Sequence, residues 1–246
     1  MWGKLFGMND LEKQKQAIAS ARRCQRNWDL TKTVSEEHID HWIDLASQAP
    51  SKQDEAFFDL YVLTDREKID YLYKEHSWGF TMIPGARDWV SRNPQMGANV
   101  MFIFNRKLPS EDIRNNEKDG TFKAADHPAR INNQFTSIGI ASGIIAFSAN
   151  QLGYVTGYGK NFGFIEQPSP SQEAWGEVLG IPNEENQLTY SLGIGFPNTD
   201  LSHNQSYDNK EFLAGGPVDY EVKSASRDIM YSTYSKTIRD IKVVRV

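Results

Sequence analysis

Three arginines crowd into one short stretch, Arg22–Arg26, which continues into Asn27-Trp28-Asp29. A guanidinium group holds two phosphate oxygens through paired, planar hydrogen bonds. Cations spaced two and four residues apart can present several donors to one terminal phosphate where a helix gives way to extended chain. The cluster is therefore a candidate site for a phosphate monoester. The alternative is a basic last helical turn that offsets the helix dipole and faces solvent.

The other residues that could do chemistry are dispersed along the chain. His38 and His41 are three apart on an expected helix, but no third metal ligand accompanies them. The sequence shows no HExxH motif, no catalytic triad and no paired-carboxylate signature. The segment 157–162 lacks the glycine spacing and the terminal Lys-Ser/Thr of a nucleotide P-loop. We therefore expect neither a metal centre nor side-chain acid–base catalysis.

Composition describes an ordinary globular protein of 246 residues, 39% of them hydrophobic, with a formal net charge of -5. This balance, with scattered Lys and Arg, argues against a nucleic-acid module, which needs a broad basic surface. The single cysteine, Cys24, excludes an internal disulfide framework and suits a reducing, cytoplasmic compartment. No segment has the length and apolar character of a membrane span, so we expect no membrane partner. No repeat or linker divides the chain, which favours one domain over residues 1–246.

Hydrophobic periodicity and capping residues predict the elements that position the candidate groups. The expected helices cover residues 10–24, 36–49, 65–76, 131–152 and 171–179. The expected strands cover residues 57–64, 99–104, 187–196 and 241–246. The polar residues 106–127 predict a surface loop or lid, and residues 198–246 form a C-terminal extension that includes a long surface excursion.

The expected helix at 131–152 is apolar on two sides rather than one. One side carries Phe135, Ile138 and Ile145, and the other carries Ile140, Ile144 and Phe147. A helix that is apolar nearly all round must be covered nearly all round. Small residues between the two sides, such as Gly139 and Gly143, permit close approach by another helix. We therefore expect a homodimer in which this helix packs against its copy.

Five short motifs follow one another along the chain: the basic cluster 22–26, Ala49-Pro50-Ser51, and the segments 157–162, 179–182 and 192–197. Their order resembles that of the nitroreductase family of FMN-dependent oxidoreductases. The basic cluster is similar to the family's opening motif, a basic-x-Ser-x-basic run that grips the flavin phosphate. Ala49-Pro50-Ser51 resembles the Pro-Ser loop before the family's first strand, and 157–162 resembles its flavin-edge loop. Residues 179–182 and 192–197 resemble the family's late helix-turn and strand. The resemblance runs through residues 10–197 in the family's order.

The phosphate-binding residues implied by the resemblance come from both ends of the chain. They are Arg22, Arg23, Cys24, Arg26, Lys236 and Arg239. Cys24 replaces the family's usual serine; its thiol is a weak donor, while its backbone N–H stays available. Lys242 or Arg245 could take the place of the C-terminal pair.

The ring-binding residues implied by the resemblance follow the Pro-Ser loop and the long helix. Pro50 and Ser51 would line the flavin ring, and Gln53 or Asp54 would take the role of an asparagine that this chain lacks. Lys160 and Asn161 would lie at the flavin edge, where the Asn161 N–H would stand beside N5, the atom that carries the chemistry.

The fold implied is α+β, a mixed, mainly antiparallel sheet surrounded by helices, with FMN at the homodimer interface formed by the long helix. The implied function is an FMN-dependent oxidoreductase that uses NADH or NADPH. It would reduce a nitroaromatic, a quinone or a similar small electrophile by ping-pong hydride transfer. Two alternatives stay open: a flavin-dependent dehalogenase or flavin-cleaving relative, and a dimeric FMN-binding protein without turnover. Asp54, Ala56 and Lys160 favour the second alternative because they depart from the family's motifs.

Overall fold

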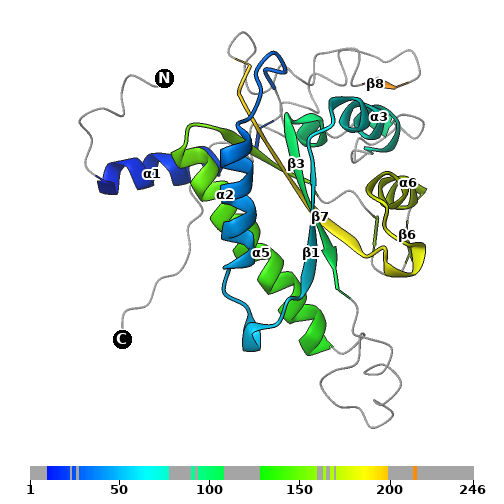
Figure 1. Ribbon diagram of the computed structural model, residues 1–246. Helices are drawn as coiled ribbons and strands as arrows, with labels where there is room; N and C mark the ends of the chain where they lie inside the picture. The colour runs from blue at the N-terminus through cyan, green and yellow to red at the C-terminus, as the bar shows by residue number, and fades with distance from the viewer. Residues whose placement is uncertain are drawn as a thin grey trace, which may run out of the picture.

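The computed structural model describes residues 10–22, 24–25, 28–77, 90–91, 94–107, 128–159, 163–164, 167–168, 170–198 and 213–214. Its architecture is α+β, with helices packed on both faces of an antiparallel sheet (Figure 1). The helices α2 and α5 lie on one face, and α3 and α6 lie on the other (Figure 1). The α+β fold predicted from the sequence is confirmed.

The helices are α1 (Asp10–Ala21), α2 (Glu36–Ser47), α3 (Arg66–His76), α5 (Pro128–Gln151) and α6 (Pro170–Leu179). Short 3-10 turns occur at η2 (Lys52–Asp54), η3 (Pro94–Gly97) and η4 (Asn183–Glu185). None of the described helices is long and apolar enough to cross a membrane.

The main sheet has the order β1-β3-β7-β4, and all of its neighbours pair antiparallel. Its strands are β1 (Phe58–Leu63), β3 (Val100–Arg106), β7 (Leu188–Gly195) and β4 (Val155–Gly159). Two small ribbons pair β2 (Val90–Ser91) with β8 (Leu213–Ala214) and β5 (Gly163–Phe164) with β6 (Gln167–Pro168).

The central strand β3 is buried along its whole length, as its continuous apolar run predicts. Alternate side chains of a strand point to opposite faces of the sheet. Phe102 and Phe104 join the core under α2 and α5, whereas Met101 and Ile103 join the core under α3 and α6. One strand therefore fills two hydrophobic cores, which leaves no solvated face on the middle of the sheet.

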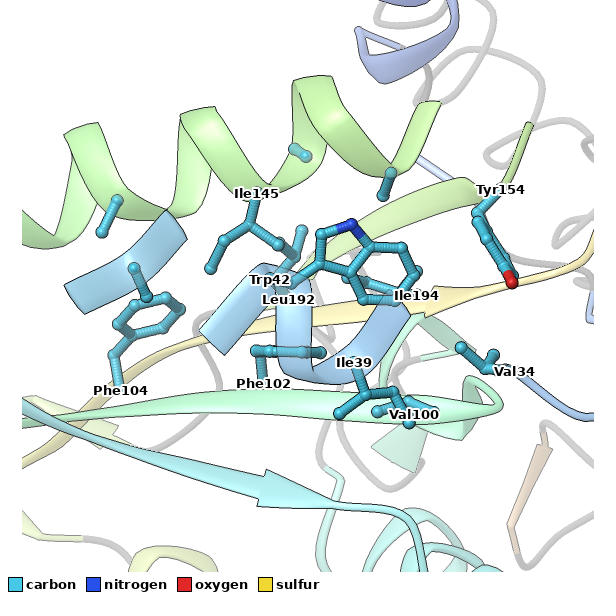
Figure 2. Close-up of a cluster of buried hydrophobic side chains, with 14 of the residues drawn as sticks. Val34, Ile39, Trp42, Val100, Phe102, Phe104, Ile145, Tyr154, Leu192 and Ile194 are labelled. Atoms are coloured by element: carbon cyan, nitrogen blue, oxygen red, sulfur yellow. The ribbon is translucent and has the colours of Figure 1, made fainter. Parts of the chain in front are cut away.

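The core between α2, α5 and the sheet is built around Trp42, which is fully buried (Figure 2). Its ring centroid lies 6.0 Å from that of Phe102 and 5.1 Å from that of Tyr154, both edge to face. Such aromatic pairs add about 0.5–1.5 kcal/mol beyond the area they bury. Ile145 of α5 belongs to the same cluster. These contacts fix α2 and α5 on the sheet, and both helices border the candidate site.

Local signals explain where two of the helices begin and end. The carboxylate of Asp65 accepts hydrogen bonds from the N–H groups of Glu67 and Lys68, as expected of the residue that opens α3. Gly153 takes a left-handed φ of 87° just after α5, as expected of a helix-ending glycine. Ser35 is the N-cap residue of α2, but its side chain makes no capping hydrogen bond.

Three expectations about elements are wrong in part. The lid cannot begin at residue 106, because Arg106 belongs to β3, is buried and pairs with Phe58 of β1; residues 108–127 lie outside the described residues. The first helix ends at Ala21 rather than near Cys24. The segment 157–162, which resembles a flavin-edge loop, is not a loop from its start, because Gly157 to Gly159 belong to β4 and pair with β7. The expected elements between 215 and 246 lie outside the described residues.

Candidate functional site

The chain that follows α1 runs along β4, one of the two edge strands of the main sheet. The Gln25 N–H donates to the Thr156 carbonyl at 2.8 Å. The Tyr158 N–H donates to Cys24 Sγ at 3.1 Å, and Cys24 Sγ donates to the Tyr158 carbonyl at 3.7 Å. The basic cluster is therefore anchored to the strand that leads into the predicted flavin-edge segment.

Gly157 allows this close approach. A Cβ atom at this position would lie 2.6 Å from the Gln25 carbonyl oxygen and 3.1 Å from the Trp28 ring. Real Cβ atoms essentially never approach a backbone atom that closely, so any larger residue would push the segment away from β4. The position of Gln25 in the basic cluster thus depends on Gly157, which lies about 130 positions later in the sequence. The contact between Cys24 and Tyr158 joins residues that are similarly far apart.

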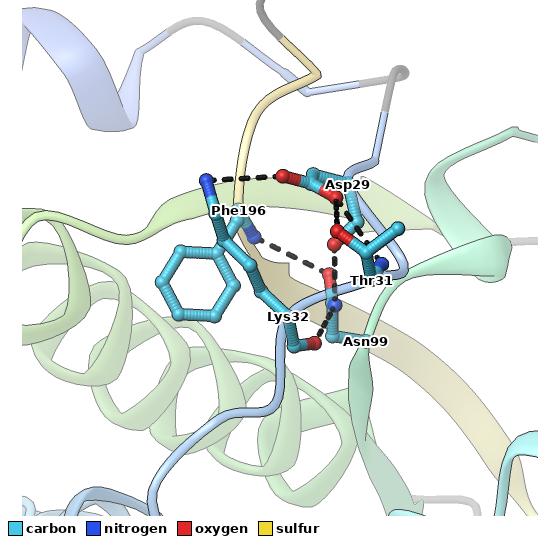
Figure 3. A network of polar contacts seen from close by, with 5 residues as sticks. All are labelled: Asp29, Thr31, Lys32, Asn99 and Phe196. Carbon is cyan, nitrogen blue, oxygen red and sulfur yellow. Dashed lines mark hydrogen bonds and ion pairs between the residues drawn. The ribbon is translucent and has the colours of Figure 1, made fainter.

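A polar network then fastens the chain to the end of β7 (Figure 3). The Asp29 N–H donates to the Phe196 carbonyl at 2.9 Å, and the Asp29 carboxylate accepts from the Thr31 N–H at 3.1 Å. Lys32 Nζ lies 3.0 Å from the same carboxylate. Asn99 Nδ2 donates to the carbonyls of Asp29 and Lys32 at 2.9 and 2.8 Å. The hydrogen bonds from Thr31, followed by Lys32, lower the pKa of Asp29.

The predicted phosphate ligands are described in part. Arg22 is exposed just after α1, and no described carboxylate forms an ion pair with it. The Cys24 Sγ atom forms hydrogen bonds with the backbone of Tyr158 in β4. Its predicted contact with the phosphate stays a prediction. Arg23, Arg26, Lys236 and Arg239 lie outside the described residues, as do the alternatives Lys242 and Arg245.

Two tyrosines lie beside Cys24, and both stay neutral at ordinary pH. The rings of Tyr158 and Tyr190 lie 6.0 Å apart. Burial raises the pKa of Tyr158 and raises that of Tyr190 further. Neither phenol therefore places a negative charge next to the basic cluster.

The predicted ring-binding residues lie in a different place. Pro50 and Ser51 line a pocket of about 240 Å³ between the end of α2 and the first half of α5. The other residues that line it are Lys52, Asn133, Thr136, Ser137 and Ile140. The pocket combines an amide, hydroxyl groups and an ammonium group with apolar carbon, which is the usual composition of a small-molecule site.

Asp54 does not line this pocket. It is exposed and takes a left-handed φ of 57°, a conformation that Asp and Asn adopt more readily than other side chains. The next residue, Glu55, lies 3.2 Å from Arg130 of α5, which neutralises it. Gln53 belongs to η2, but its side chain is not described, and Lys160 and Asn161 lie outside the described residues. Their flavin contacts stay predictions.

Within one chain the two halves of the predicted site lie toward opposite ends of α5 (Figure 1). The pocket uses α5 residues up to Ile140, whereas Cys24 and Gln25 contact the strand that follows Gln151. An α-helix rises 1.5 Å per residue, so α5 extends about 16 Å between these two points. The structure brings Cys24 to β4 and Ser51 to α5, but it does not bring the two halves together.

Sequence reasoning missed the polar residues that α5 contributes to the pocket. Asn133, Thr136, Ser137 and Ile140 recur at the i, i+3, i+4, i+7 spacing of one helix face. Three polar side chains on one face of an otherwise apolar helix were the signal that could have identified them. Among the described residues, no group of three His, Cys, Asp or Glu side chains could hold a metal ion.

Comparisons with known proteins agree with this architecture. The sequence pattern of the nitroreductase family matches residues 19–196. The fold is similar to that of NfrA2 from B. megaterium, with 19% identity over 92% of this chain and 83% of that chain and a TM-score of 0.55. It is also similar to an FMN-dependent nitroreductase from Clostridium difficile, with 15% identity over 84% and 95% of the two chains and a TM-score of 0.52.

A third similar structure is a nitroreductase with bound FMN from Desulfitobacterium hafniense. It shares 17% identity over 78% of this chain and 91% of that chain, with a TM-score of 0.50. At these identities the likeness establishes the fold alone. No curated protein matches the chain in sequence.

Proposed function

Because the chain belongs to the nitroreductase family, we propose that it is an FMN-dependent NAD(P)H oxidoreductase. Its acceptor is a nitroaromatic, a quinone or a similar small electrophile, reduced by ping-pong hydride transfer. The observation that carries this proposal is the family match over residues 19–196, which includes the basic cluster and every residue of the pocket. The similar protein from D. hafniense holds bound FMN, which supports the choice of cofactor.

The described residues fit FMN in two respects. Arg22 is exposed and free of ion pairs within the described part of the chain, so its guanidinium is available to a phosphate. The pocket beside Ser51 offers Asn133 and Thr136 as hydrogen-bonding groups next to apolar Ile140, which suits a ring that carries carbonyl groups on an apolar body. Bound FMN supplies the hydride chemistry.

The chain itself contributes binding, orientation and charge. Arg22 holds the phosphate, and Ser51 and Thr136 hold polar atoms at the ring edge. Pro50 and Ile140 exclude water from the ring. Because Arg130 neutralises Glu55, that carboxylate does not oppose electron-rich reduced flavin. No side-chain acid or base is required, which agrees with the absence of catalytic motifs in the sequence.

We also propose that the active protein is a homodimer. The described residues leave part of one face of α5 exposed: Ile140 is 37% exposed, and Ile43 of the neighbouring α2 is 38% exposed. A Cβ atom on Gly139 or Gly143 would meet nothing within 4 Å, so a second helix can approach there closely. A second copy on this face would place the phosphate half of one chain near the ring half of the other. The single cysteine of the sequence favours a cytoplasmic location.

Spectroscopy of the purified protein tests the proposal. We expect a yellow protein whose visible absorbance bleaches when NADH or NADPH is added without oxygen and returns when a nitroaromatic or a quinone is added. A colourless protein that takes up no FMN on reconstitution would contradict the cofactor. A yellow protein that neither nucleotide bleaches would instead be a binding protein without turnover.

A further inference from the structure

Lys52 differs from the other described lysines in its charge environment. Five of them lie within 4.0 Å of a carboxylate: Lys13, Lys15, Lys32, Lys68 and Lys107. Lys74 also makes an interaction. Lys52 is exposed and forms no ion pair with any described residue, although the chain carries a net charge of -5. Its ammonium group is therefore not neutralised by the described part of the chain.

The ammonium group of Lys52 is available to a ligand because Lys52 lines the pocket. It lines the pocket of about 240 Å³ together with Ser51 and the neutral polar face of α5. No carboxylate is among the residues that line the pocket. Glu55 is held by Arg130 at 3.2 Å, which leaves Asp54, outside the pocket, as the nearest unneutralised acid in sequence. The pocket is thus lined by uncharged residues, several of which can form hydrogen bonds, and by the single positive charge of Lys52.

We propose that Lys52 is a specificity-determining residue that favours electron acceptors bearing a carboxylate on a single aromatic ring. The inference rests on the proposed function, because Lys52 follows Ser51, which that function places at the flavin ring. A charge-assisted hydrogen bond from the Lys52 ammonium to the carboxylate orients the acceptor beside the flavin ring. An acceptor without the acid group loses this bond. The phosphate of FMN is assigned to the basic cluster near the other end of α5, so it does not compete for Lys52.

Binding measurements test the inference without relying on turnover. The probes are 4-nitrobenzoate and its neutral counterpart 4-nitrobenzyl alcohol, titrated into the purified chain by calorimetry. We expect Lys52→Gln to weaken 4-nitrobenzoate binding about fivefold and to change 4-nitrobenzyl alcohol binding less than about twofold. Lys52→Arg should restore most of the preference. Lys68→Gln, which removes the same charge from α3, should leave both affinities unchanged.

Two further measurements sharpen the result. Raising the salt concentration to about 1 M should abolish most of the wild-type preference, because screening weakens exposed charge pairs. Asp54→Asn should strengthen 4-nitrobenzoate binding, because it removes the nearby unneutralised acid; asparagine tolerates the left-handed φ of this position.

The outcomes separate this inference from the proposed function. Equal affinity of the wild type for both probes, or equal losses for both in Lys52→Gln, would overturn the role of Lys52 even if both compounds are reduced. If Lys52→Gln slows reduction by NADPH and not by NADH while both probes bind as before, the lysine serves the nucleotide instead. Discriminating binding by a protein that takes up no FMN would support Lys52 as an anion-recognising residue and overturn the oxidoreductase.

Discussion

Arg22 carries the most direct prediction at the scale of single residues. It is exposed after α1 and free of described ion pairs, so its removal should not disturb the fold. We expect Arg22→Ala to weaken FMN binding about tenfold and to leave riboflavin binding nearly unchanged, because riboflavin lacks the phosphate. Fluorescence titration of both ligands measures this. Lys13→Ala on the same helix is the matched control, and equal losses for the two ligands would remove Arg22 from the phosphate site.

Cys24 shows what a single residue could and could not reveal from sequence. The sequence identified it as a departure from the serine of the family motif. It could not show that the thiol accepts a hydrogen bond from the Tyr158 N–H, because that partner lies 134 positions away. The thiol thus occupies a pairing position at the edge of β4. This contact explains how a weak donor is accommodated within the basic cluster.

Asp29, in the segment that follows the basic cluster, makes the stability of the fold depend on pH. Its pKa is lowered by the hydrogen bonds from Thr31 and by Lys32, so the folded state holds the proton less tightly than the unfolded chain does. The stabilisation is therefore complete above the unfolded pKa and is lost as the pH falls through the lowered folded pKa. We expect Asp29→Asn to reduce stability against urea at about pH 7 and to reduce it less at about pH 2, where the carboxyl group is increasingly protonated in both states. An equal loss at both pH values would show that the charge of Asp29 is not involved.

At the scale of elements, Gly157 governs how the basic cluster lies on β4. Gly157→Ala would place a methyl group 2.6 Å from the Gln25 carbonyl oxygen, so either β4 or the backbone at Gln25 must move. We expect a loss of about 1–3 kcal/mol in unfolding free energy, the usual cost of overpacking, together with weaker FMN binding. Gly97→Ala is the control, because its Cβ atom would meet the Tyr73 ring at an ordinary 3.5 Å. Equal stability of the two variants would contradict the close packing.

Some elements could be predicted from sequence because their signals are local. The apolar run of β3 and the capping Asp65 of α3 each act within a few residues of the element they specify. β4 was missed because Gly157 and Gly159 resemble turn residues, while its strand geometry comes from pairing with β7. The pocket was missed for the same reason, since it joins residues 50–52 to α5, about 80 positions later.

At the scale of the whole molecule, the partly exposed face of α5 predicts a dimer. Gly143→Phe should fold, because a side chain at this position meets open space within one chain. We expect the variant to be largely monomeric and to release FMN, because the helices can no longer approach closely. Light scattering and flavin absorbance measure the two effects. Glu177→Phe, an exposed position on α6, is the control, and a Gly143→Phe dimer with full flavin occupancy would contradict the interface.

The separation of the two site halves along α5 makes a further prediction about the assembled dimer. Arg22→Ala damages only the phosphate half, and Ser51→Trp fills only the ring half. If each FMN site combines the phosphate half of one chain with the ring half of its partner, both homodimeric variants bind FMN poorly. A hybrid dimer then holds one doubly damaged site and one intact site.

Mixing the two variants by joint unfolding and refolding therefore decides whether the site is shared. Random pairing makes about half of the dimers hybrid, so about a quarter of the wild-type FMN sites should reappear. If instead one chain supplies both halves, every site in a hybrid carries one damaged half and no binding returns. As the control, the same mixing is repeated with Gly143→Phe added to both chains. FMN binding that depends on the dimer must then fail to return. Restored binding in this control would show that two chains combine their halves without close packing at Gly143, and the α5 interface would have to be abandoned.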